Sequence, residues 1–168
     1  MEKGTGGFLS PQKALDQLEI NAASKIADFG CGHGYFAIPL AKMVGQDGQI
    51  YAVDVLQDAL NEVKERAERE NLSNIQTVRG NLEAPDGSKL PENSCDMVLL
   101  ANVLFQSNKK ADIIKEARRV LKSNGKMIIV DWHVTSEALT LNSGWRIGPQ
   151  EAQGLAESQN FSFERTFD

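Results

Sequence analysis

Apolar and polar positions along this chain follow two periods in turn, and together they predict alternating strands and helices. Short apolar runs with few charges are typical of buried strands, whereas apolar residues three or four apart in a charged segment predict helices. The expected strands are residues 25–29, 49–54, 75–79, 97–100, 126–131 and 161–167. The expected helices begin at Ser10-Pro11, span residues 35–44, 58–70 and 109–121, and end with one opened by Gly148-Pro149.

This alternation predicts an α/β fold: a Rossmann-like, doubly wound and largely parallel sheet with helices on both faces. The run Met97-Val98-Leu99-Leu100 shows no polar alternation, as expected for a strand that is buried on both faces. A chain of 168 residues can bury a sizeable core, so we expect a single domain over residues 1–168.

Composition narrows the range of partners. The net charge of −5 and the pI near 5.1 argue against a nucleic-acid partner, because no basic excess is present to replace condensed counterions. No apolar run is long enough to span a membrane, and Met1-Glu2-Lys3-Gly4 does not begin a signal peptide. We therefore expect a cytoplasmic protein. Two cysteines, Cys31 and Cys95, form neither a metal-ligand spacing nor a disulfide framework.

The glycine-rich segment Asp28-Phe29-Gly30-Cys31-Gly32-His33-Gly34 is the main candidate for chemistry. It follows the first predicted strand and precedes a helix, and Asp54 ends the second strand 20 residues past Gly34. Glycines permit a tight turn and a close approach of a ligand to the main chain. A carboxylate at the end of the second strand can accept two hydrogen bonds from a ribose diol. The sequence thus predicts a cofactor that contains a nucleoside.

Two nucleoside cofactors fit this segment. The residues from Gly32 to Ala37 match the G-x-G-x-x-A form of the dinucleotide fingerprint, so a nicotinamide-dependent oxidoreductase is one alternative. However, a carboxylate at Asp28 would repel a pyrophosphate and would favour a cationic sulfonium amino acid. Gly30 also extends the pattern to D-x-G-x-G-x-G. These two features favour the sulfonium cofactor.

The order of motifs resembles that of the class I S-adenosylmethionine-dependent methyltransferases over nearly the whole chain. The glycine segment is similar to their first motif, and Val53-Asp54 to the acidic end of their second strand. Gly80-Asn81 stands where the family often has Gly-Asp, and residues 121–125 resemble its Leu-Lys-Pro-Gly-Gly turn. This resemblance implies S-adenosylmethionine as cofactor, S-adenosylhomocysteine as product and the strand order 3-2-1-4-5-6.

The resemblance also implies roles for particular residues. The glycine backbone would line the methionine part of the cofactor, Asp28 would orient its amino group, and Asp54 would bind the ribose hydroxyls. Val55, or else Leu56, would pack beside the adenine, and Asn81 and Leu82 would meet its edge. Ala101 and Asn102 would form the floor of the pocket. The implied cofactor-binding residues are Asp28, Gly30, Cys31, Gly32, Gly34, Asp54, Val55, Asn81, Leu82, Ala101 and Asn102.

Methyl transfer from a sulfonium is an in-line displacement that depends mainly on alignment, so no catalytic triad is required. Asp131 and His133, at the end of the fifth predicted strand, are the weak candidates for a catalytic base. No metal is expected, because Asp131 is the one acid placed to bind it. We expect a small-molecule acceptor. A cofactor-binding fold without catalysis, acting as a partner subunit, stays open as an alternative.

The end of the chain departs from the family pattern. Residues 161–167 supply a sixth strand, and no seventh strand follows within these 168 residues. Natural proteins avoid an exposed apolar edge strand. We therefore expect either that the sixth strand moves beside the fifth, or that a second copy pairs there and gives a homo-oligomer through the edge of strand five or six.

Overall fold

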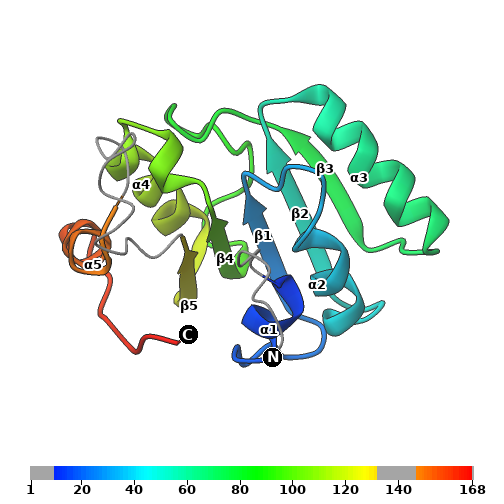
Figure 1. The fold of residues 1–168 in the computed structure, drawn as a ribbon, viewed down its shortest axis with the longest axis horizontal. Helices are drawn as coiled ribbons and strands as arrows, with labels where there is room; N and C mark the ends of the chain where they lie inside the picture. Colours follow the sequence, from blue (N-terminus) through cyan, green and yellow to red (C-terminus); the bar gives the residue numbers. More distant parts are fainter. Residues whose placement is uncertain (1–9, 132–146, 168) are drawn as a thin grey trace, which may run out of the picture.

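Residues 10–131 and 147–167 are described in a computed structural model of the chain (Figure 1). Strands and helices alternate along it. The strands are β1 (Lys25–Phe29), β2 (Gln49–Asp54), β3 (Ile75–Arg79), β4 (Cys95–Ala101) and β5 (Leu121–Val130). The α-helices are α1 (Pro11–Leu15), α2 (Ala37–Val44), α3 (Gln57–Arg69), α4 (Lys110–Val120) and α5 (Pro149–Ser158), and a short 3-10 helix, η1, spans Leu104–Gln106.

The strands form one parallel sheet in the order β3-β2-β1-β4-β5. This confirms the α/β, Rossmann-like class and the predicted order of these strands. Asp28 lies in register between Ala52 on β2 and Leu99 on β4. Since all strands point the same way, the loops that follow β1, β2, β3 and β4 meet at one edge of the sheet (Figure 1).

Two apolar cores cover the two faces of the sheet. Successive side chains of a strand point to opposite faces, and Ile26 of β1 belongs to one core while Ala27 and Phe29 belong to the other. Helices α1, α2 and α3 contribute to the first core, and α4 and α5 to the second. This layering buries the sheet and leaves its loop edge for chemistry.

Some element ends differ from the prediction for local reasons. Helix α2 begins at Ala37 rather than at residue 35, because the turn after the glycines extends that far. Strand β5 begins at Leu121, which pairs with Cys95, and its register shifts before Lys126 pairs with Met97. The predicted turn over residues 122–125 is therefore a bulge within β5, and the helix before it ends at Val120.

The predicted sixth strand is wrong: residues 161–167 form no strand. Phe161 packs against the core under α4 and α5, whereas Phe167 packs against the core on the other face. Between them, Glu164 forms an ion pair with Lys126 of β5 at 2.8 Å, and Arg165 donates to the carbonyl of Gln17 at 2.9 Å. The segment therefore contacts the cores on both faces of the sheet, and it forms no strand ladder with β5.

Two further expectations can be compared with the described residues. Within residues 10–131 and 147–167, no helix has the length and apolarity needed to cross a membrane. Cys31 and Cys95 are both buried free thiols.

Candidate cofactor site

The loops at the carboxyl ends of the strands are joined by main-chain contacts. The N–H groups of Gly30 and Cys31 both donate to the carbonyl of Val53, at 2.8 and 3.1 Å. The Gly80 N–H donates to the carbonyl of Asp54 at 3.0 Å. These bonds hold the loop after β1, the end of β2 and the loop after β3 in one cluster.

The glycine loop uses backbone angles that other residues rarely adopt. Gly30, Gly32 and Gly34 have φ angles of 74°, 50° and 81°, in the left-handed region. A Cβ atom on Gly30 would lie 2.5 Å from Cγ2 of Val103, so this glycine allows the loop to approach the segment after β4. A Cβ atom on Gly32 would meet no heavy atom of the described residues within 4 Å. Among residues 10–131 and 147–167, the space beside Gly32 is therefore open to a ligand.

Asp54 ties this loop to the second strand. Its Oδ2 atom accepts the Gly32 N–H at 2.9 Å, and its Oδ1 atom accepts the Leu56 N–H at 2.9 Å. A carboxylate oxygen has more than one lone pair, so both atoms can still accept from a ligand hydroxyl. Asp54 thus stands where the sequence placed it, beside the open space at Gly32.

Asp28 lies beneath the same loop and is only 1% exposed. The backbone N–H of Ala37, at the start of α2, donates to its carboxyl group, while its Oδ2 atom has no hydrogen-bond partner among the described residues. Burial raises the pKa of Asp28 to about 7; the Ala37 N–H lowers the pKa and the charge of Asp54 raises it. A buried, half-satisfied carboxyl group of this kind is typical of a binding site.

Cys31 has no nucleophilic character here. It is 6% exposed, and burial, together with the charges of Asp28 and Asp54, raises the pKa of its thiol far above the usual range. Because the thiolate is the reactive form, this residue contributes shape and backbone rather than chemistry.

The loop after β3 brings Asn81 and Leu82 toward Asp54 through the Gly80 contact. The Oδ1 atom of Asn81 accepts the Glu83 N–H at 3.1 Å, which closes an Asx turn, and the residue is exposed. Leu82 is 7% exposed and packs into the core with Val53. Its side chain therefore supports the loop from below.

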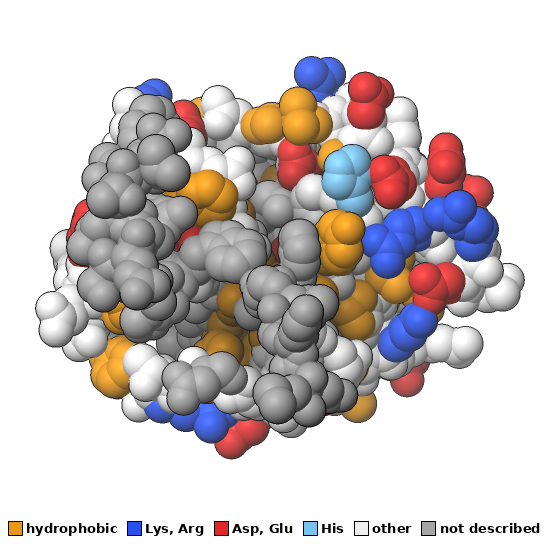
Figure 2. All heavy atoms as spheres, in the orientation of Figure 1, with side chains coloured by type: hydrophobic (Ala, Val, Ile, Leu, Met, Phe, Trp, Pro, Cys, Tyr) orange, Lys and Arg blue, Asp and Glu red, His pale blue; other side chains and the backbone are white. Residues whose placement is uncertain are grey.

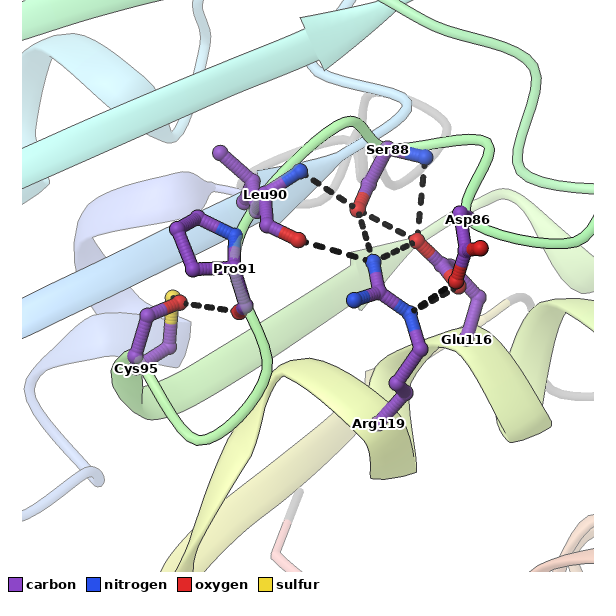
Figure 3. Close-up of polar contacts among 8 residues, drawn as sticks. Asp86, Ser88, Leu90, Pro91, Cys95, Glu116 and Arg119 are labelled. Atoms are coloured by element: carbon purple, nitrogen blue, oxygen red, sulfur yellow. Dashed lines mark hydrogen bonds and ion pairs between the residues drawn. The ribbon is translucent and has the colours of Figure 1, made fainter.

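A buried ion pair anchors the far end of this loop (Figure 3). Glu116 of α4 is 4% exposed and accepts Arg119 N–H groups at 2.7 and 2.9 Å. Its Oε1 atom also accepts the N–H and hydroxyl of Ser88, at 3.0 and 2.5 Å. Arg119 in turn donates to the Leu90 carbonyl at 2.8 Å and pairs with Asp86 at 3.0 Å. The loop over residues 80–94 is thereby fixed to α4.

The segment after β4 closes the cluster from the other side. Ala101 ends the strand, and Asn102 follows with a φ angle of 56°, an angle that asparagine tolerates better than most residues. The Asn102 N–H donates to the carbonyl of Val130 at 2.7 Å, which joins this segment to the end of β5. Both residues are half-buried.

The other predicted residues follow β2 and β5 along the chain. Val55 and Leu56 are exposed, at 50% and 63%, immediately after Asp54. Asp131 follows Val130 at the end of β5 and is half-buried. His133 lies outside the described residues. In the space-filling view, Lys and Arg side chains are mixed with Asp and Glu side chains over α3 (Figure 2).

A cavity of about 800 Å³ opens at the amino ends of the strands, at the edge of the sheet opposite to the glycine loop. Its charged side chains already have partners: Lys122 pairs with Asp96 at 2.6 Å, and Lys126 pairs with Glu164. In parallel α/β sheets ligands bind at the carboxyl ends of the strands. The edge that carries Asp28 and Asp54 is therefore the candidate site.

Several contacts of the site escaped sequence reasoning. Arg66 of α3 donates to the His33 carbonyl at 2.6 Å, and Glu62 pairs with the His33 ring at 2.5 Å, so α3 holds the outer part of the glycine loop. Val103 faces Gly30 from the segment after β4. The spacing of Glu62 and Arg66, four apart on a charged helix face, predicts only a solvated pair; nothing in it indicates a loop contact.

Comparison with known proteins agrees with this geometry. Residues 20–161 match the family described as methyltransferase domain. The chain belongs to this methyltransferase family. This confirms the resemblance to class I S-adenosylmethionine-dependent methyltransferases inferred from the motifs, and S-adenosylmethionine is the cofactor of that class.

Individual relatives of this methyltransferase share 30% identity or less with it over about two thirds of the chain. A demethylmenaquinone methyltransferase of Bacillus mycoides is 30% identical over 115 residues, which cover 68% of this chain and 47% of the relative. A protein of Saccharolobus solfataricus named probable cobalt-precorrin-6B C(15)-methyltransferase (decarboxylating) is 28% identical over 117 residues, or 69% of this chain and 56% of the relative. The chain thus spans about half the length of the curated relatives it matches.

Among solved structures, a SAM dependent methyltransferase from Aquifex aeolicus aligns with a TM-score of 0.81 and 23% identity, over 92% of this chain and 81% of that one. At this identity the likeness concerns the fold of the methyltransferase domain, which the structure alignment supports over nearly its whole length.

Proposed function

We propose that this methyltransferase domain binds S-adenosylmethionine across the loop between β1 and α2 and transfers its methyl group to a small-molecule acceptor. One observation carries the proposal: Asp54 accepts the Gly32 N–H at 2.9 Å, directly beside space that no described heavy atom fills. A diol-binding carboxylate and an open, left-handed glycine thus meet at the loop edge of the sheet.

The residues present fit this cofactor. The cofactor has a cationic amino acid end and a ribose diol. The unpartnered Oδ2 atom of Asp28 is an acceptor for the cation, and the carboxylate of Asp54 is an acceptor for the diol. Val55 and Leu56, both exposed, offer apolar surface beside Asp54 for a base. Asn81 offers a polar edge on the neighbouring loop.

When bound, S-adenosylmethionine supplies an electrophilic methyl group for in-line displacement. The chain's own contribution would be positional: Asp28 and Asp54 would hold the two ends of the cofactor. Positioning of this kind accounts for several kcal/mol of a displacement barrier. We assign no catalytic base; Asp131, at the end of β5, and His133 stay candidates for acceptors that hold their proton tightly.

The acceptor class is also a proposal. The relatives named above act, by their names, on a demethylmenaquinone and on a cobalt-precorrin, which are different compounds. Their disagreement favours no single acceptor for this chain. The net charge of −5 and the mixed surface charge support a small molecule rather than a nucleic acid. A cytoplasmic location is proposed from the sequence alone.

Calorimetry with S-adenosylmethionine tests the cofactor site. Asp54→Ala should weaken binding by about 1.5–3 kcal/mol, the range for hydrogen bonds to a charged group. Asp47→Ala, the same change in an exposed turn at the other end of the strands, should leave the affinity unchanged. Equal affinities for the two variants would remove Asp54 from the site.

A methyl-release assay over pools of small molecules then separates the enzyme from its alternatives. Turnover supports the proposed transfer, whereas tight binding with no turnover on any pool supports a catalytically silent partner subunit. The nicotinamide alternative is tested by titration with NADH and its fluorescence. Binding of NADH in competition with S-adenosylhomocysteine would contradict the proposed site chemistry.

A further inference from the structure

We propose that Asp28 is a proton-linked ligand of the cofactor: entry of the cofactor's ammonium group displaces a proton from the Asp28 carboxyl group. This inference rests on the proposed cofactor site and adds a linkage between cofactor affinity and pH. In the step, the O–H bond of the carboxylic acid breaks, the proton passes to the buffer, and the carboxylate stays in place opposite the ammonium.

The geometry leaves the charge of Asp28 uncompensated in the free protein. The side chain is 1% exposed, one backbone N–H donates to it, and its Oδ2 atom has no partner in the described part of the chain. No Lys, Arg or His of the described residues forms an ion pair with it. An unpaired buried carboxylate is costly, so the neutral form is favoured.

The groups around Asp28 reinforce this preference. Asp54, from the end of β2, is a like charge, and the Cys31 thiol of the glycine loop is neutral. Helix α2 presents the N–H of Ala37, while the register partners on β2 and β4, Ala52 and Leu99, are apolar. Helix α1 adds apolar Ala14 and Leu15 to the core on this face. No neighbour described here supplies the missing positive charge.

A cationic ligand would supply that charge. Free α-amino groups have pKa values of about 7.7–8.0, so the cofactor's ammonium is charged below neutral pH. Burial raises the pKa of Asp28 to about 7, so near pH 6 most of the free protein carries the proton. Pairing with an ammonium reverses the preference and releases that proton.

The test is calorimetry with S-adenosylhomocysteine at pH 6.0, in two buffers that differ in ionisation enthalpy. The difference between the observed heats counts the protons released. We expect roughly 0.5–1 proton per ligand, and an affinity that rises roughly 5- to 10-fold between pH 5.5 and 6.5. 5′-Methylthioadenosine, which has the same nucleoside but no amino acid, should release close to none and so controls for other titrating groups.

Variants locate the proton. Asp28→Asn keeps the shape and an acceptor for Ala37 and should abolish both the proton release and the pH dependence, while Asp47→Asn should keep both. In the wild-type protein, the carboxyl carbon NMR signal of Asp28 should titrate near neutral pH without ligand and stop doing so with S-adenosylhomocysteine.

The outcomes distinguish the two proposals. Binding of S-adenosylhomocysteine without proton release, or release that persists in Asp28→Asn, overturns the linkage and leaves the cofactor site standing. Failure of both ligands to bind at any pH overturns the cofactor site and the linkage with it.

Discussion

The carboxylate of Asp54 and the backbone N–H of Gly32 form a 2.9 Å hydrogen bond between the end of β2 and the centre of the glycine loop. The bond gives Asp54 two functions, because the group expected to bind the ribose also holds the loop on which the cofactor would lie. Under the proposed function, organisation of the loop and binding of the ligand would therefore be coupled.

Substitutions at two glycines of the loop should affect folding and cofactor binding differently. Gly30→Ala places a Cβ atom 2.5 Å from Val103 and should destabilise the fold, whereas the Cβ atom of Gly32→Ala meets no heavy atom within 4 Å in the described part of the chain. Both have left-handed φ angles, which cost an alanine about 1–2 kcal/mol. We expect Gly32→Ala to lose no more than this in urea unfolding, yet to lose most of its cofactor affinity. Unchanged affinity would contradict the open-space argument.

Asp28 should make the protein less stable as pH rises. Its pKa is 3.8 when unperturbed and about 7 in the fold, so the folded state binds more protons between these values. Stability is then lost as the pH rises through that window. Asn at this position removes the buried charge, and we expect Asp28→Asn to stabilise the protein by on the order of 1–3 kcal/mol at pH 8 and by little at pH 4. Urea unfolding at both pH values measures this difference; a variant less stable than wild type at pH 8 would contradict it.

The Glu116–Arg119 pair should have the opposite pH dependence. Burial alone would raise the pKa of Glu116, but hydrogen bonds from Arg119 and Ser88 outweigh it, and the pKa lies below 4.5. The pair therefore stabilises the fold above pH 4.5, and this contribution is lost as the pH falls through the lowered pKa. Arg119→Met leaves a buried carboxylate without its cation and should cost about 3–5 kcal/mol at pH 7.

Two comparisons make this prediction specific. Lys115→Met changes an exposed residue on the same helix and should have a small effect. The cost of Arg119→Met should shrink between pH 7 and pH 4 in urea unfolding, as Glu116 takes up a proton. A cost that does not depend on pH would show that lost packing, and not the charge, explains it.

The segment over residues 161–167 should protect β5. Phe161 and Phe167 attach it to opposite faces of the sheet, and Phe163 between them is 52% exposed. Replacing both anchors by serine should free the segment and promote self-association through the edge of β5. Sedimentation velocity at several concentrations measures this. Phe163→Ser is the matched control and should sediment as the wild-type protein does. If the double variant at Phe161 and Phe167 also sediments like the wild-type protein, the segment does not shield the edge of β5.

The sequence by itself was sufficient for the fold class, and its resemblance to a known family was sufficient for the strand order up to β5. Local patterns predicted the elements: apolar runs marked strands, glycines marked the turn, and Asp54 stood at the end of a predicted strand. Such features depend on neighbours along the chain, so they can be read before any tertiary contact is known.

Tertiary structure decided what depends on partners distant in sequence. The alternation Phe161-Ser162-Phe163 is typical of a strand, yet burial of Phe161 and Phe167 on opposite faces directs the chain across the sheet. The unpartnered oxygen of Asp28 and the contact between Gly30 and Val103 likewise arise only when separate loops meet. A side chain's charge state and a strand's pairing are set by their surroundings in space, because the free energies of burial and hydrogen bonding depend on which groups are brought together.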